Sequence, residues 1–154
     1  MAKGKGTARL HRIIKAPVER VYKAFVDKSA LEYWSPPYGF TGSITNMDVR
    51  EGGGYNMSFT NFSTGTSHAF TVKYVELKPN ERIRETDTFD HGPTNDVMTV
   101  TAEFKKVACG TELTIVQDGI PAEIPVEFCY AGWQESLAQL AYLVEPEIPD
   151  HPAE

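Results

Sequence analysis

The amino-acid sequence predicts an α+β fold in which a curved antiparallel β-sheet of about six to seven strands wraps around a long C-terminal α-helix. Three observations lead to this prediction. Between residues 42 and 115, apolar residues recur mostly at every second position, as in half-buried strands. Turn-forming residues interrupt this pattern at short intervals, as in an antiparallel meander. Towards the C-terminus the spacing changes to three and four residues, which indicates an amphipathic helix.

The length and composition are those of one globular domain. The chain has 154 residues, of which 41% are hydrophobic and 23% are charged, so it can bury a core. Both ends are polar or rich in proline, which is typical of segments outside a core. We therefore expect a flexible N-terminus at residues 1–7, a single domain at residues 8–145 and a flexible C-terminal tail at residues 146–154.

One strand and two short helices are predicted near the N-terminus. The strand spans residues 8–15 and ends before Pro17, because proline cannot donate a hydrogen bond to a β-ladder. The second helix begins near Ser29, a good N-cap, with Glu32 three residues later as in a capping box. The first helix has helical spacing at Val18, Val21, Tyr22, Phe25 and Val26.

Alternation of apolar and polar residues identifies the later strands, and a stripe of apolar residues at helical spacing identifies the last element. Residues 52–54 are three glycines that fit a turn or bulge with positive φ. The alternating positions are Tyr55, Met57 and Phe59; Phe70, Val72 and Tyr74, with a bulge near Val75; and Met98, Val100, Ala102 and Phe104. The C-terminal stripe consists of Val126, Cys129, Trp133, Leu137, Leu140 and Val144. No other predicted element carries a stripe that could cover the apolar face of the sheet.

Five motifs in this order resemble one known family. They are Ala16-Pro17-x-x-x-Val21-Tyr22-x-x-Phe25, Leu31-x-x-Trp34-x-Pro36, Asp48-x-Arg50-x-Gly52-Gly53, Gly110-Thr111-x-Leu113-Thr114 and Gly132-Trp133-x-x-x-Leu137-x-x-Leu140. Over about Thr7 to Val144 the chain resembles the helix-grip proteins of the START-like, Bet v 1-like (SRPBCC) superfamily. Within it, the chain is most similar to the group related to the C-terminal domain of the activator of Hsp90 ATPase.

The resemblance implies a helix-grip fold with a cavity between the sheet and the C-terminal helix. Such a cavity would bind a small apolar molecule (a lipid, a flavonoid or a polyketide-like compound), with a role in stress response. The candidate ligand-binding residues are Trp34, Phe40, Tyr55, Met57, Phe59, Phe70, Val72, Tyr74, Met98, Val100, Trp133 and Leu137. The alternative is that these side chains only pack a filled core, as buried aromatic residues commonly do.

Three polar residues share the strand parity of core positions. If Ile83 and Phe89 face the interior, Glu85 and Asp87 face it too, and burial would raise the pKa of their carboxyl groups. His68 has the parity of Phe70. These three are candidate acid–base residues; the alternatives are a register break for the carboxylates and a surface position beside a turn for His68.

Other functional classes find no support in the sequence. A net charge of −6 disfavours nucleic acid and anionic membranes as partners, and no segment is long and apolar enough to span a membrane. The four histidines (His11, His68, His91 and His151) lack paired ligand spacing, and we expect His91 to be exposed in a tight loop. We therefore expect no metal and no cofactor. Two isolated cysteines, Cys109 and Cys129, suggest free thiols and a cytoplasmic location.

The function predicted from the sequence is non-enzymatic binding of a small apolar ligand. Two alternatives stay open: a cyclase or hydrolase that uses acid–base residues in the cavity, and a co-chaperone-like interaction domain with a chaperone as its partner. The sequence leaves both a monomer and a homodimer open.

Overall fold

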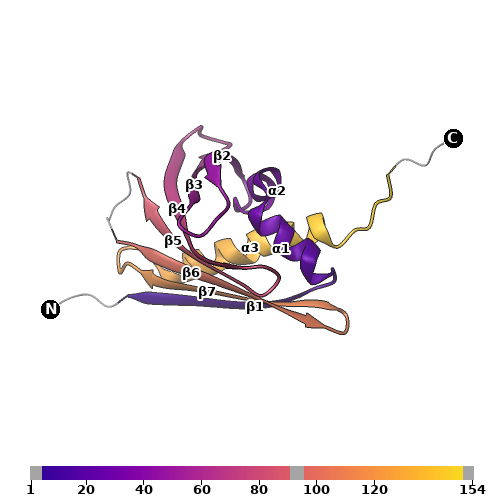
Figure 1. Cartoon of the computed structure of the whole chain (residues 1–154). Coiled ribbons are helices and arrows are strands. Elements are labelled where there is room, and N and C mark those ends of the chain that lie inside the picture. The colour runs from indigo at the N-terminus through magenta and orange to yellow at the C-terminus, as the bar shows by residue number, and fades with distance from the viewer. Residues whose placement is uncertain (1–4, 91–95, 151–154) are drawn as a thin grey trace.

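The computed structural model describes residues 5–90 and 96–150. The predictions for residues 1–4 and 151–154, for His91 and for His151 fall outside these ranges. Within them, the predicted order of elements is confirmed (Figure 1). The elements are β1 (Gly6–Ile14), α1 (Val18–Val26), α2 (Lys28–Trp34), β2 (Phe40–Asp48), β3 (Gly54–Asn61), β4 (Ser67–Lys78), β5 (Arg82–Phe89), β6 (Met98–Val107), β7 (Gly110–Ile120) and α3 (Val126–Val144).

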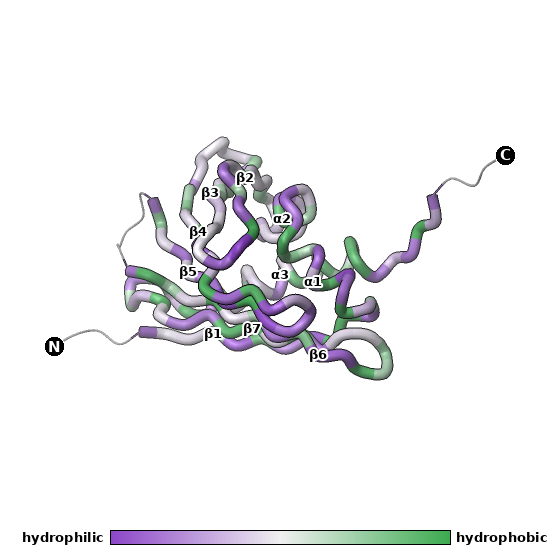
Figure 2. Tube along the Cα trace, viewed as in Figure 1, coloured by the Kyte–Doolittle hydropathy of each residue, from purple (hydrophilic) through white to green (hydrophobic). Residues whose placement is uncertain are grey.

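The strands form one antiparallel sheet of seven strands in the order β1-β7-β6-β5-β4-β3-β2. Strands β2 to β7 are consecutive in the chain and pair with their neighbours, whereas β1 joins the sheet beside the last strand, β7. The sheet curves, so that β1, β7 and β6 lie on one side of α3 while β2, β3 and β4 rise on another (Figure 1). Hydrophobic and hydrophilic residues alternate along the strands, which keeps one face apolar (Figure 2).

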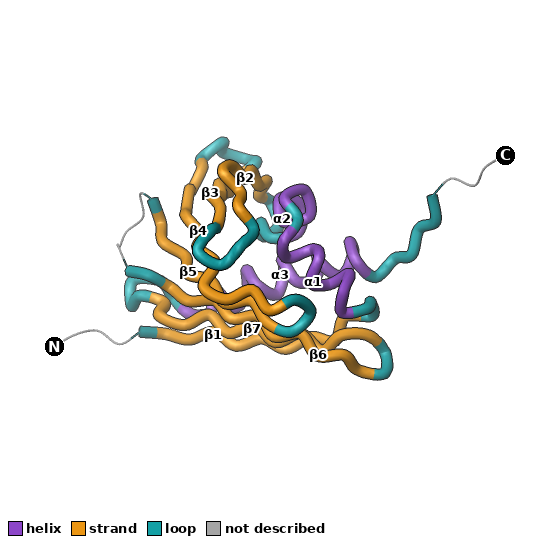
Figure 3. Tube along the Cα trace, in the orientation of Figure 1, coloured by secondary structure: helices purple, strands orange, loops and turns teal. Residues whose placement is uncertain are grey.

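The core lies where the curved sheet meets the C-terminal half of α3. Leu137, Leu140 and Val144 are buried there, against Ile14 and Leu113 among others. Helices α1 and α2 pack on each other and on α3, and so close one end of the sheet (Figure 3). The N-terminal half of α3 differs: Val126, Cys129 and Trp133 belong to the predicted stripe but are only half-buried. Val126 and Cys129 pack against a second, smaller cluster formed by Ala8, Met98 and Ile120, and Trp133 packs against the main core.

The N-terminus of α2 differs from the prediction. Asp27, not Ser29, is the N-cap, and its carboxylate accepts a hydrogen bond from the amide of Ala30 at 3.0 Å. Glu32 does not complete a capping box; its carboxylate accepts from the amide of Ile44 at 2.7 Å and so ties α2 to β2. Asp27 is the N-cap because its backbone is extended and it lies between α1 and α2, whereas Ser29 is already helical.

Two local predictions about the backbone are confirmed, and one boundary is earlier than expected. Gly52 adopts a φ of +87°, and the ladder between β4 and β5 shifts register between Tyr74 and Glu76. Strand β1 begins at Gly6, so residues 6 and 7, expected to be flexible, pair with β7. Among the described residues, no helix is long and apolar enough to cross a membrane.

Candidate ligand-binding cavity

A cavity of about 360 Å³ lies between the curved sheet and the helices α2 and α3. This volume is within the range of about 300–1,000 Å³ that is usual for small-molecule sites. The walls are mostly apolar, and the cavity is only partly enclosed. Its lining residues are Phe25, Leu31, Trp34, Ser35, Pro37, Phe40, Tyr55, Met57, Phe59, His68, Phe70, Val72, Glu85, Asp87, Phe89, Met98, Val100, Gln117, Cys129, Gly132, Trp133 and Ser136.

The lining includes all of the predicted ligand-binding residues except Tyr74 and Leu137. These two side chains are almost fully buried and belong to the core beside the cavity. The interior between sheet and helix is therefore not completely filled by side chains. Contact of the lining residues with a ligand stays a prediction.

Aromatic rings in edge-to-face contact make one wall of the cavity. Phe59 on β3 and Phe70 on β4 have ring centroids 5.0 Å apart with nearly perpendicular planes, and Phe70 meets Phe89 on β5 at 6.5 Å. Phe25 and Trp34 lie 4.7 Å apart on the helical side. Each pair restrains the rotamers of its partners, so this wall is a preformed apolar surface.

The carboxylates of β5 face this cavity from the centre of the sheet. Glu85 and Asp87 are two residues apart and therefore project from the same face of the strand. Glu85 lies opposite Tyr74 on β4 and Val100 on β6, and Asp87 lies opposite Val72 and Met98. The register break that would have turned them outward does not occur within β5. Both side chains are half-buried at the cavity wall, beside Val72, Met98 and Val100.

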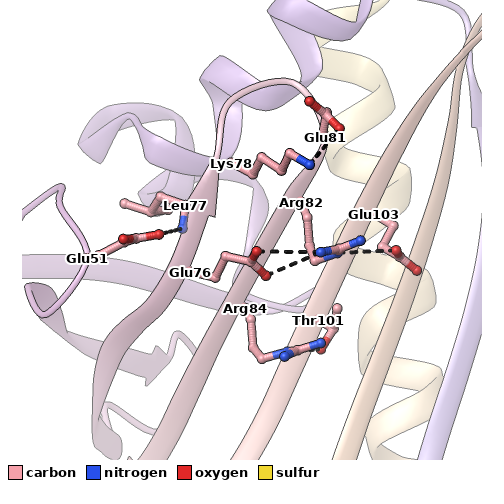
Figure 4. A network of polar contacts seen from close by, with 9 residues as sticks. All are labelled: Glu51, Glu76, Leu77, Lys78, Glu81, Arg82, Arg84, Thr101 and Glu103. Carbon is pink, nitrogen blue, oxygen red and sulfur yellow. Dashed lines mark hydrogen bonds and ion pairs between the residues drawn. The ribbon is translucent and has the colours of Figure 1, made fainter.

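The arginines of β5 point to the opposite face of the sheet, so neither of them is a counter-ion for these carboxylates. Arg82 lies between Glu103 at 3.3 Å and Glu76 at 3.5 Å (Figure 4). Arg84 donates from Nε to the hydroxyl of Thr101 at 3.4 Å (Figure 4). The alternation that brings Glu85 inward thus sends both guanidinium groups outward.

Burial has a large effect on the ionisation of this pair. Desolvation raises the pKa of Asp87 to about 7. Desolvation and the neighbouring charge of Asp87 raise the pKa of Glu85 well above its ordinary value, and a hydrogen bond from Tyr55 opposes that rise in part. Asp87 Oδ1 and the hydroxyl of Tyr74 are buried and have no hydrogen-bond partner among the described residues. The polar end of the cavity therefore has unused hydrogen-bonding capacity.

A glutamine that sequence reasoning missed connects the sheet to α3. Gln117 on β7 accepts a hydrogen bond at Oε1 from the indole Nε1 of Trp133 at 2.8 Å. Its amide nitrogen donates to the sulfur of Met98 at 3.3 Å. The signal was present in the sequence, because Gln117 continues the alternation of Leu113 and Ile115. Its position fixes the ring of Trp133 at the cavity wall.

The open end of the cavity is formed by β4, α2 and α3. His68 is exposed and also lines the cavity, so an acid–base role for it stays a prediction. Ser136 donates to the carbonyl of Ser35 at 2.6 Å, and Gln139 donates to the carbonyl of Trp34 at 3.0 Å. These hydrogen bonds hold the end of α2 against α3.

Comparison with known proteins places the chain in a family. The family model described as "Activator of Hsp90 ATPase homolog 1-like protein" matches residues 15–145, most of the chain. The chain belongs to this family. None of the curated proteins matches the chain.

Solved structures of similar proteins share the fold of this chain. Protein CV1439 from Chromobacterium violaceum is 52% identical to this AHSA1-like chain, with a TM-score of 0.89 over 92% of this chain and 98% of the other. An AHSA1-like protein from Aeromonas hydrophila is 17% identical, with a TM-score of 0.72 over 89% and 90% of the two chains. A protein from Arthrobacter aurescens is 19% identical, with a TM-score of 0.79 over 96% and 93%. The latter two support the fold alone.

The thiols of this AHSA1-like chain occupy different environments. Both Cys109 and Cys129 are free. Cys109 is exposed in the turn between β6 and β7, whereas Cys129 on α3 is half-buried and lines the cavity, where desolvation raises the pKa of its thiol. Cys129 is therefore a chemical reporter of access to the cavity.

Proposed function

We propose that this AHSA1-like domain binds a small, largely apolar molecule in the cavity between the sheet and α3. The observation that carries the proposal is a cavity of about 360 Å³ with mostly apolar walls beside an otherwise well-buried core. Filling it removes apolar surface from water, at about 25 cal/mol per Å² before the costs of association. Lipids, flavonoids and polyketide-like compounds are the ligand classes to screen.

Intrinsic fluorescence offers a direct assay, because both tryptophans of the chain, Trp34 and Trp133, line the cavity. We expect a bound aromatic or alkyl ligand to change their emission and to raise the melting temperature of the protein. The stabilisation grows with ligand concentration above the Kd, because the ligand binds only the folded state. Absence of both effects across a broad panel would contradict the proposal.

A variant that fills the cavity makes the test specific. Gly132 lies in α3 at the cavity wall, and a Cβ added there would meet no atom within 4 Å. Gly132→Leu should therefore fit the fold, improve helix propensity by up to about 1 kcal/mol and occupy space that the ligand needs. The matched control is Ala131→Leu, which places the same side chain at an exposed neighbouring position. We expect Gly132→Leu to lose binding and Ala131→Leu to keep it.

A second candidate function is acid–base catalysis, and the buried pair Glu85 and Asp87 is the observation that favours it. A carboxyl group with a pKa near 7 can both accept and donate a proton at neutral pH, and Asp87 has that property. The test is turnover of ester and polyketide-like substrates by the protein and by Asp87→Asn. Turnover with a bell-shaped pH profile that disappears in Asp87→Asn would support catalysis, whereas binding without turnover would leave a carrier.

A further inference from the structure

The polar groups of the cavity are acidic or neutral. Strand β5 contributes Glu85 and Asp87, and β3 contributes Tyr55. The remaining titratable groups at or beside the cavity are Tyr74 on β4, Cys129 on α3 and, at the exposed rim, His68; Tyr22 on α1 lies near Tyr74. In the described part of the chain, the lining contains neither lysine nor arginine. The cavity thus has one polar end, of negative sign when ionised.

The acidic end is incomplete within the folded chain. Asp87 lines the cavity, its side chain is half-buried, and its Oδ1 is buried with no partner among the described residues. Its cross-strand neighbours, Val72 and Met98, have no hydrogen to donate to it from their side chains. Arg84 points to the other face of the sheet (Figure 4). A buried acceptor without a donor costs free energy that a ligand with a donor can recover.

We propose that the ligand of this cavity is an apolar amine, whose ammonium group donates to the carboxylates of Asp87 and Glu85 while its hydrocarbon body fills the aromatic part of the site. This inference rests on the proposed function and specifies the chemistry of its ligand. A primary aliphatic amine, like a lysine side chain, has a pKa of about 10.4 and is a cation at neutral pH. Aromatic faces in the wall favour a cation further.

Charge separates this ligand from other apolar molecules. An alkyl carboxylate would place a negative charge beside two acidic groups in a site of low dielectric, where like charges repel strongly. An alcohol can donate one hydrogen bond but cannot compensate an ionised carboxylate. An ammonium stabilises an ionised carboxylate, so its binding should release a proton from Asp87 near its pKa of about 7.

Three eight-carbon probes that differ only in their head group test the proposal. Octylamine, 1-octanol and octanoate are titrated into the protein at pH 8 by isothermal calorimetry. We expect octylamine to bind about ten- to one-hundredfold more tightly than 1-octanol, as for a hydrogen bond to a charged group, and octanoate to bind most weakly. In Asp87→Asn the ratio of octylamine to 1-octanol affinity should fall by about tenfold or more, while in Asp90→Asn, an exposed aspartate at the end of the same strand, it should not change.

The pH dependence gives an independent readout. As the pH rises from 5 to 8, Asp87 loses its proton, and octylamine affinity should increase while 1-octanol affinity stays flat or falls. In buffers with different ionisation enthalpies, the heat of octylamine binding at pH 7 should differ, because protons are released. If 1-octanol or octanoate binds as tightly as octylamine, the amine inference fails and the proposed function stands. If none of the three binds and the broad panel of apolar ligands is also silent, the proposed function itself fails.

Discussion

Replacing Asp87 with asparagine should stabilise the protein above neutral pH. The carboxyl group has an ordinary pKa of 3.8, and burial raises it to about 7 in the folded state. The folded protein therefore holds this proton more tightly than the unfolded chain. Between these two values the folded state binds more protons, so the free energy of unfolding falls as the pH rises. The stability that comes from the protonated state of Asp87 is fully present below pH 4 and lost by about pH 8.

The magnitude follows from the shift in pKa. At 1.36 kcal/mol per tenfold change in affinity for the proton, the rise in the pKa of Asp87 from 3.8 to about 7 corresponds to a loss of about 4 kcal/mol between pH 4 and pH 8. Asparagine resembles the neutral aspartic acid in shape and cannot ionise, so Asp87→Asn escapes this loss. We expect the variant to be close to wild type at pH 4 and more stable by about 2–4 kcal/mol at pH 8, the lower figure allowing for imperfect hydrogen bonding of the amide.

The assay is urea unfolding followed by circular dichroism at intervals from pH 4 to pH 9. Asp90→Asn is the matched control, because Asp90 is exposed and asparagine can still accept the hydrogen bond from Thr71. The control should stay within about 0.5 kcal/mol of wild type throughout. The difference curve between Asp87→Asn and wild type should therefore rise through neutral pH. A flat difference curve, or a variant less stable than wild type at pH 8, would refute the buried position of this carboxylate.

Two further predictions concern the backbone and the thiols. Gly110 has a φ of +145°, and a Cβ there would overlap the carbonyl oxygen of Ile14, so Gly110→Ala should lower the free energy of unfolding in urea by more than about 2 kcal/mol. Gly65 also has a positive φ but open space around it, so Gly65→Ala should lower it by about 1 kcal/mol. Equal losses in the two variants would contradict the close approach of Ile14 to Gly110. With a thiol reagent such as DTNB at pH 8, exposed Cys109 should react at least about tenfold faster than Cys129. Ligands bound in the cavity should slow the reaction of Cys129 alone. Similar reaction rates of the two thiols would show that the cavity thiol is freely accessible.

The sequence predicted the elements and the inward face of each strand because both depend on local periodicity. The parity that makes Ile83 a core residue also made Glu85 and Asp87 inward-facing, and the structure has all three on that face. The same parity places Arg84 outside. Its partner, Thr101, depends on the pairing of β5 with β6 and could not be read from the order of residues alone.

The boundary between cavity and core was beyond the reach of sequence periodicity. Tyr74 shares its strand and parity with Val72, yet Val72 lines the cavity and Tyr74 packs in the core. Leu137 lies one helical turn after Trp133 on the same stripe, yet Leu137 packs in the core and Trp133 lines the cavity. The difference depends on how the curved sheet as a whole packs against α3 (Figure 1). Curvature is a property of the whole sheet, so no local pattern reports it.

The position of β1 has a consequence for how the chain folds. Leu10 lies opposite Ile115, so this strand has no partner in the sheet until β7 has been synthesised. The hairpins from β2 to β7 close short loops, whereas docking β1 closes a loop through most of the molecule and carries the largest entropic cost of any strand pairing here. During translation the apolar side of β1 stays exposed until β7 has been made. Kinetic control of folding should therefore lie in the pairing of the first strand with the last.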